Sequence, residues 1–176
     1  MSGHNKWSKI KNKKGVTDAQ KSKIFTKLVR AIAVEAKKSA GDVNSPGLRT
    51  AIEKAKAENM PSQNIEKAIK KATEGGDTPM EAVTYEAYGP EGVAIIIESL
   101  TDNRNKAAAE IKHILSKNNL ELAPMGAASW AFTKINGAWE ATSNIEITEQ
   151  AGLKLQKLIE DLEDNDDVQE IYTNAN

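Results

Sequence analysis

Nine cationic side chains lie between Gly3 and Arg30, and Asp18 is the single acid among them. Lysines that neutralise phosphates release condensed counterions, so such a segment can bind the backbone of a nucleic acid. The alternative is a solvated tail, a common state of lysine-rich termini. Trp7 lies inside the run, and the cations are Lys6, Lys9, Lys11, Lys13, Lys14, Lys21, Lys23, Lys27 and Arg30.

Two elements must carry these cations. Residues 1–16 lack hydrophobic periodicity, and we expect a flexible basic arm that orders on binding. Thr17 and Gln20 have the spacing of a capping box, which predicts a helix from there to about Lys38. Its periodicity places Lys23, Lys27 and Arg30 opposite the apolar residues. A solvated face explains the helix alone, but the arm and the helix together favour a binding surface.

The net charge of -1 conceals a division between the two halves of the chain. Residues 1–78 hold 17 Lys+Arg and 8 Asp+Glu, a net charge of +9, whereas residues 79–176 hold 7 and 17, a net charge of -10. Charge asymmetry of this kind indicates separate roles, with the basic half facing nucleic acid.

The composition argues against several other classes of protein. Without cysteine, the chain has no disulfide, thiolate metal site or cysteine nucleophile, and its two histidines, His4 and His113, lack metal spacing. The longest strongly apolar run, Val93 to Ile97, is too short to span a bilayer. We therefore expect a cytoplasmic protein with no catalytic residues, no metal, no cofactor, no membrane contact and no small-molecule substrate.

After Gly41, two more short amphipathic helices are predicted. Ser45-Pro46 provides an N-cap and first helical position, and Met60-Pro61-Ser62 ends that helix and starts the next, which Gly75-Gly76 closes. Residues 17–78 should therefore form a basic three-helix bundle. The four-residue turn before the third helix permits a helix-turn-helix, and Lys67, Lys70 and Lys71 lie outward there, but plain bundles share this pattern.

The acidic half, residues 79–176, is predicted to be an α+β domain of ferredoxin-like type. Alternation at Val83, Tyr85 and Ala87 indicates an added strand before two βαβ units. Strands are expected at residues 93–100, 129–132, 145–147 and 168–173, with helices at 101–117 and 148–162. No strand has the basic and aromatic signature of an RNA-recognition motif, so base stacking on the sheet is not expected.

Acidic side chains cluster near the C-terminus and allow one enzymatic hypothesis, a metal-dependent nuclease. The cluster lacks the calcium-loop pattern and has no glycine inside it, so a solvated helix end is the simpler interpretation. Its members are Glu160, Asp161, Glu163, Asp164, Asp166 and Asp167. We expect no cleavage of nucleic acid with magnesium or manganese.

Six ordered motifs resemble the YebC family, which includes the PmpR-type bacterial regulators and the mitochondrial translational activator of cytochrome oxidase. They span both ends and most of the middle of the chain. The motifs are Gly3-His4-Asn5-Lys6-Trp7, Lys23-Ile24-Phe25-Thr26-Lys27-Leu28, Asn59-Met60-Pro61, Tyr88-Gly89-Pro90, Leu100-Thr101-Asp102-Asn103-Arg104-Asn105, and Asp166-Asp167-Val168-Gln169 with Tyr172 and Asn174.

The resemblance implies a three-helix domain followed by α+β structure in a non-enzymatic, cytoplasmic, nucleic-acid-binding protein. Longer members carry a second ferredoxin-like domain inserted within the first α+β domain. Here the chain runs from Phe132 through Gly137 to Ile145 with no room for it, so we expect a short member lacking that third domain.

We predict a DNA-binding transcriptional regulator that holds DNA through the arm and the first helix. The alternative is a translation factor that binds the ribosome and ribosomal RNA, because lysine contacts phosphate in both nucleic acids and structured RNA is recognised largely by shape. The candidate contacts are Lys6, Trp7, Lys9, Lys11, Lys13, Lys14, Lys23, Lys27 and Arg30, with His4, Asn59, Met60, Asp102, Asn103, Arg104 and Asn105 as additional candidates. Helix capping and turn formation explain the segments Asn59-Met60-Pro61 and Asp102 to Asn105 about as well.

Overall fold

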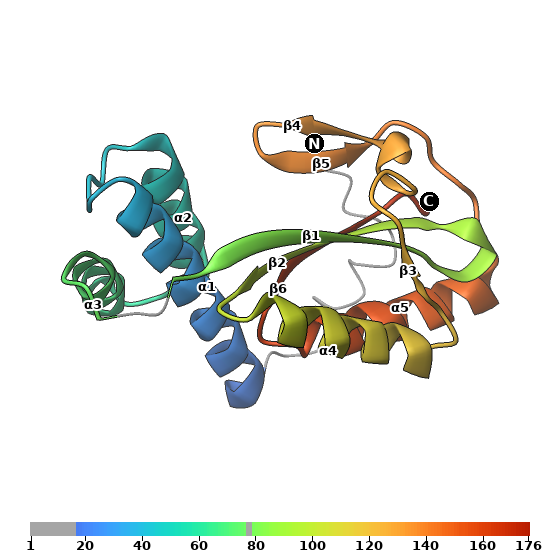
Figure 1. Cartoon of the computed structure of the whole chain (residues 1–176), viewed down its shortest axis with the longest axis horizontal. Coiled ribbons are helices and arrows are strands. Elements are labelled where there is room, and N and C mark those ends of the chain that lie inside the picture. The colour runs from blue at the N-terminus through green and yellow to red at the C-terminus, as the bar shows by residue number, and fades with distance from the viewer. Residues whose placement is uncertain (1–16, 77–78) are drawn as a thin grey trace. The chain divides into compact units, whose positions relative to one another are not determined.

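The computed structural model describes residues 17–76 and 79–176 of the chain, which form two compact units, Thr17–Glu81 and Ala82–Asn176. Its helices and strands make a mixed α+β protein (Figure 1). The predicted arm, residues 1–16, lies outside the described residues.

Three helices form the first unit. They are α1 (Asp18–Lys38), α2 (Pro46–Ala57) and α3 (Ser62–Thr73), and α1 packs against both of the others. The capping box predicted for α1 is present, because Thr17 Oγ1 accepts from Gln20 N at 3.2 Å and Gln20 Oε1 accepts from Thr17 N at 2.9 Å. One apolar cluster joins the helices, with Ile32 from α1, Leu48 from α2 and Ile65 from α3.

The second unit is built on a four-stranded sheet in the order β3-β1-β2-β6. Its strands are β1 (Glu81–Tyr88), β2 (Ala94–Thr101), β3 (Leu122–Ala123) and β6 (Val168–Thr173). Strand β3 pairs antiparallel with β1, and β6 pairs antiparallel with β2. Two helices, α4 (Arg104–Lys117) and α5 (Glu149–Glu163), cover one face of the sheet (Figure 1).

Each face of the sheet has its own apolar core, because side chains alternate along β2. Ile95 and Ile97 pack with Ile111 of α4 and Leu155 of α5 on the helical face. Ala94 and Ile96 lie in a second cluster with Ala131 and Phe132. The hairpin of β4 (Phe132–Ile135) and β5 (Ala138–Ala141) contributes to that cluster and lies on the face opposite the helices (Figure 1).

Two predicted strands are wrong. Of residues 129–132, the first three form a 3-10 turn, η3 (Ser129–Ala131), and Phe132 begins β4, which pairs with β5 outside the four-stranded sheet. Residues 145–147 make one isolated parallel bridge, from Ile145 to Ala175. The first predicted βαβ unit is formed, by β2, α4 and β3. The second is not, because no strand of the four-stranded sheet directly precedes α5. Ile145 and Ile147 alternate with polar residues because both pack against the core, not because they belong to a strand.

Candidate nucleic-acid interface

The structure gives the predicted contacts on α1 less exposure than the helix periodicity suggested. Lys23, Lys27 and Arg30 are half-buried, and each takes part in an interaction. The exposed cations of α1 are Lys21 near its N-terminus and Lys37 and Lys38 at its C-terminal end, where Lys38 Nζ is 2.8 Å from Glu35 Oε1. The predicted contacts in the arm (His4, Lys6, Trp7, Lys9, Lys11, Lys13 and Lys14) lie outside the described residues.

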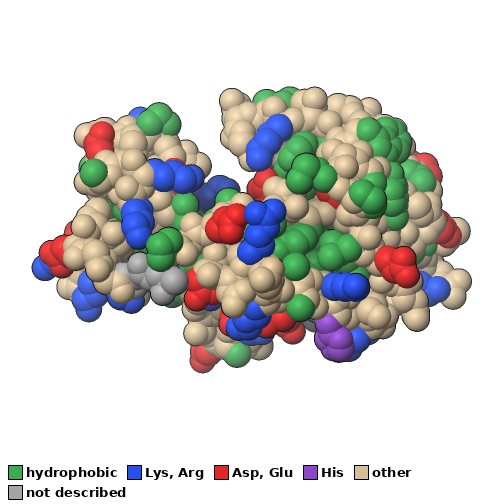
Figure 2. Space-filling view, viewed as in Figure 1, with side chains coloured by type: hydrophobic (Ala, Val, Ile, Leu, Met, Phe, Trp, Pro, Cys, Tyr) green, Lys and Arg blue, Asp and Glu red, His purple; other side chains and the backbone are tan. Residues whose placement is uncertain are grey.

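Helices α2 and α3 carry exposed cations that the site prediction left out. Figure 2 shows Lys and Arg side chains spread over this unit, with fewer Asp and Glu among them. The cations of the two helices are Arg49, Lys54, Lys56, Lys67, Lys70 and Lys71, and all are exposed. Helical periodicity alone could have found them, because each lies outside the apolar positions of its helix.

The turn between α2 and α3 shows what Asn59 and Met60 do. Asn59 has a φ of 59°, the left-handed conformation that commonly ends a helix, and Met60 N donates to Ala55 O at 2.9 Å. Met60 is only 4% exposed and belongs to the apolar core of the helical unit. The interpretation of Met60 as a contact is therefore corrected, because a buried side chain packs between the helices and does not face a partner.

The segment from Asp102 to Asn105 forms the start of α4. Asn103 is its N-cap, because its Oδ1 accepts from Lys106 N at 3.0 Å. Asn103 N donates to the buried Thr101 Oγ1 at 3.0 Å, and Thr101 Oγ1 in turn donates to Asp167 Oδ2 at 2.9 Å. The capping interpretation of Asn103 is confirmed, while Asp102, Arg104 and Asn105 are exposed.

A buried carboxylate organises the loop between β3 and η3, and sequence reasoning missed it. Glu86 is only 4% exposed, and its two oxygens accept from the backbone N–H groups of Gly126 and Ser129, the latter at 2.6 Å. Trp130 Nε1 donates to Tyr88 Oη at 2.9 Å, and Tyr88 Oη donates to the carbonyl of Ala127. An acid in a half-buried strand gave no signal of this role.

Two acids near α5 have lowered pKa values because hydrogen bonds favour their charged forms. The backbone N–H and the hydroxyl of Thr148, at the N-cap of α5, lower the pKa of Glu91. Asn118 Nδ2 and Lys157 Nζ, each 3.0 Å from Asp161 Oδ2, lower the pKa of Asp161. These carboxylates hold α5 in place, so their role here is structural.

Residues 17–76 and 79–176, which the structure describes, hold neither a metal-ligand cluster nor a membrane-spanning helix. Those residues include no group of three or more His, Cys, Asp or Glu side chains that could hold a metal ion. No helix among them is long and apolar enough to cross a membrane.

Charge divides the described residues on either side of residues 77–78, close to the boundary between the two units. Residues 17–76 hold 12 Lys+Arg and 7 Asp+Glu, a net charge of +5, whereas residues 79–176 have a net charge of -10. A basic helical unit is thus followed by an acidic α+β unit, and a basic surface attracts polyanions.

Comparison with known proteins gives the family. The model for the TACO1/YebC protein N-terminal domain matches residues 5–75, and the model for the TACO1/YebC second and third domain matches residues 80–137 and 135–175. The chain therefore belongs to the TACO1/YebC family.

Relatives in three bacteria share the name "Probable transcriptional regulatory protein". The protein of Trichlorobacter lovleyi is 45% identical over 98% of this chain and 70% of its own length. The protein of Desulfosudis oleivorans is 46% identical over 98% of this chain and 71% of its own length. The protein of Finegoldia magna is 53% identical over 76% of this chain and 56% of its own length. The crystal structure of a conserved hypothetical protein from Aquifex aeolicus is 29% identical, with a TM-score of 0.79 over 90% of this chain and 91% of that chain.

The two segments matched by the second model meet at residues 135–137, the turn between β4 and β5. Asn136 and Gly137 have φ values of 50° and 84°, as expected for a two-residue type I′ hairpin turn. The chain covers about 70% of the Trichlorobacter relative, so the longer protein has additional residues. This chain is a short member of the family, and the meeting of the two matched segments agrees with the absence of an inserted domain.

Proposed function

We propose that this chain is a non-enzymatic, cytoplasmic, DNA-binding transcriptional regulator. The proposed contacts are the lysines of the arm (Lys6, Lys9, Lys11, Lys13 and Lys14) with Trp7, and Lys23, Lys27 and Arg30 of α1. Half-burial of the α1 cations is compatible with this role, because long side chains bury their stems and present a charged end. The relatives named as transcriptional regulatory proteins support the regulatory part of the proposal.

The observation that carries the proposal is the separation of charge between the units. A net charge of +5 over residues 17–76 attracts phosphates, and the -10 of residues 79–176 repels them. We interpret the first unit as a three-helix bundle that binds the nucleic acid. We interpret the second unit as a ferredoxin-like domain whose surfaces are open to other contacts. Binding should then be confined to the N-terminal half of the chain.

A translation factor bound to ribosomal RNA is the second candidate. The dominance of lysine favours it, since Arg30 and Arg49 are the two arginines among the 12 cations of residues 17–76. Lysine contacts phosphate as a point charge, whereas arginine reads guanine bidentately, so lysine suits binding by shape. Asp102, Arg104 and Asn105, all exposed before or in the first turn of α4, are candidate contacts in this case.

A competition experiment separates the two candidates. Labelled duplex DNA and purified ribosomes are offered together at about 150 mM salt, a physiological ionic strength. The full chain is compared with a chain that lacks residues 1–16. We expect the full chain to prefer DNA and the shortened chain to lose that binding. Preference for ribosomes, with DNA displaced, would replace the transcriptional proposal by the translational one.

A further inference from the structure

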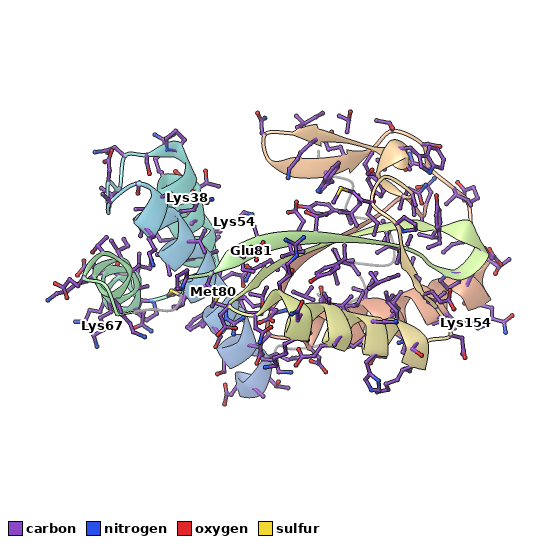
Figure 3. All side chains as sticks on the ribbon, viewed as in Figure 1. Lys38, Lys54, Lys67, Met80, Glu81 and Lys154 are labelled. Atoms are coloured by element: carbon purple, nitrogen blue, oxygen red, sulfur yellow. The ribbon has the colours of Figure 1, made fainter. Side chains whose placement is uncertain are left out.

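The exposed face of α3 carries amides near its N-terminal end and lysines beyond them. Helical periodicity places Gln63, Lys67 and Lys70 on the side away from the buried residues Ile65, Ala68 and Ala72, and it places Lys71 and Asn64 at the edge of that side. Figure 3 shows Lys67 on the outer side of α3. The members of this face are Gln63, Asn64, Lys67, Lys70 and Lys71, and all five are exposed.

The acids of α3 leave this face largely positive. Glu66 lies to one side, in a groove between α2 and α3 that Arg49 and Ile52 also line. Glu74 is the C-cap residue at the far end of α3, and its Oε1 lies 3.8 Å from Lys70 Nζ. Three exposed lysines and one flanking acid, Glu66, therefore leave α3 with a net positive outer face toward a polyanion.

The turn before α3 fixes the position of this face within the unit. Residues 58–61 make the connection, with Asn59 in the left-handed conformation and Met60 buried beneath the turn. Figure 1 shows α3 nearly end-on beside α1 and α2, so it crosses them and does not run alongside. A short turn between two crossing helices is the geometry of a helix-turn-helix, in which the second helix enters the major groove of DNA.

We propose that α3 is the helix that enters the major groove of duplex DNA, with Gln63 and Asn64 at base edges and the lysines on phosphates. Asparagine and glutamine amides bond bidentately to adenine, whereas lysine neutralises phosphate without selecting a base. A-form RNA has a deep, narrow major groove that side chains cannot read, so the surface fits B-form DNA. The inference rests on the proposed DNA-binding function and adds a reading helix to the arm and α1.

The lysines are tested through the salt dependence of binding to labelled duplex DNA. The full chain is compared with the double variant Lys67→Ala/Lys71→Ala and with the charge-matched control Lys112→Ala/Lys154→Ala, whose sites are exposed on α4 and α5. The slope of log K against log salt should fall by about 1.8 for the first variant, roughly 0.9 for each lost phosphate contact, and stay unchanged for the control. Equal losses in both variants would overturn the proposal.

The amides are tested through base preference. A preferred duplex is first selected from a random library with the full chain. The variant Gln63→Ala/Asn64→Ala should keep the slope of log K against log salt. At a base pair that these amides contact, its affinity preference for the selected base pair over the others should fall roughly 5- to 150-fold. Unchanged preference in a variant with an unchanged circular dichroism spectrum would contradict a reading role for α3.

The outcomes also separate this inference from the function on which it rests. If the full chain fails to bind duplex DNA, the proposed function itself is wrong. If it binds, but only deletion of residues 1–16 or substitution of Lys23 and Lys27 lowers the slope, DNA binding stands and α3 is excluded. Equal binding of a folded RNA, with the same losses in the α3 variants, would contradict major-groove entry.

Discussion

Thr101 Oγ1 donates a hydrogen bond to Asp167 Oδ2 at 2.9 Å, between two residues that lie 66 positions apart and are both buried. The contact joins the end of β2 to the start of β6, where Leu100 N also donates to Asp167 O at 2.8 Å. Thr101 Oγ1 also accepts from Asn103 N, so the same hydroxyl connects both strands to the N-terminus of α4. Two of the family motifs thus make one structural junction.

Substitution of Thr101 by Val should destabilise the α+β unit by about 1–3 kcal/mol, because the buried Asp167 carboxylate and Asn103 N would each lose a partner. Chemical denaturation measures the change. Thr133→Val, at an exposed position of β4, is the control and should change stability by less than about 0.5 kcal/mol. Similar values for the two variants would show that the junction contributes nothing.

Glu86→Gln should loosen the loop from Pro124 to Ser129. One amide oxygen cannot accept from both Gly126 N and Ser129 N as the carboxylate does, and the new NH2 group would face a donor. We expect a loss of about 1–3 kcal/mol and faster hydrogen exchange at these two amides. Glu121→Gln, an exposed acid before β3, is the control. Unchanged protection at Ser129 would rule out this anchoring role.

The lowered pKa of Asp161 predicts a stability change at acid pH. A carboxyl whose folded pKa lies below its usual 3.8 stabilises the fold above that value, and this contribution disappears as the pH falls through the folded pKa. Carboxyl NMR titration should therefore give a pKa below 3.8, and Lys157→Ala should raise it by removing one hydrogen bond. An ordinary pKa in the unmodified chain would contradict the assigned hydrogen bonds.

The turn between β4 and β5 should accept an insertion. Trp139 Nε1 and Lys134 Nζ lie 2.9 Å and 3.1 Å from Glu98 Oε1, so side chains hold the hairpin to β2 independently of its turn. Eight Gly and Ser residues between Asn136 and Gly137 should cost about 1.4 kcal/mol, from the entropy of closing a loop five times as long.

The control insertion follows Glu91, whose carboxylate accepts from Thr148 N and Oγ1, and it should cost more because it disturbs that contact. Denaturant midpoints compare the two insertions. A larger loss at the hairpin than after Glu91 would show that the turn itself holds the hairpin.

Local signals predicted the helices well. Thr17 with Gln20 marked the start of α1 and Thr148 that of α5, because capping depends on a few neighbouring residues. Ser45-Pro46 marked the start of α2, where Pro46 takes the first helical position but the Ser45 side chain makes no cap hydrogen bond. Strands depend on distant partners, and the sequence does not show them. The two-residue strand β3 carried too little pattern to be predicted, and it exists because β1 provides its hydrogen bonds.

The candidate site was only partly predictable for the same reason. Periodicity placed Lys23, Lys27 and Arg30 opposite the apolar face of α1, but it could not show that they become half-buried. Met60 lies next to a helix-breaking proline and resembles a turn residue, yet the crossing of the helices buries it. Short-range patterns identify the faces of a helix, and packing decides which of those faces remain open.

The salt dependence of duplex DNA binding by the full chain tests the central claim most directly. Lysine contacts to phosphates predict a linear fall of log K with log salt, and six to ten contacts would cost roughly 10³–10⁵ in affinity between about 50 and 200 mM salt. A steep fall of this size would support a nucleic-acid-binding protein whose affinity comes from its basic N-terminal half. A flat response, or no measurable binding at the lower salt concentration, would contradict it.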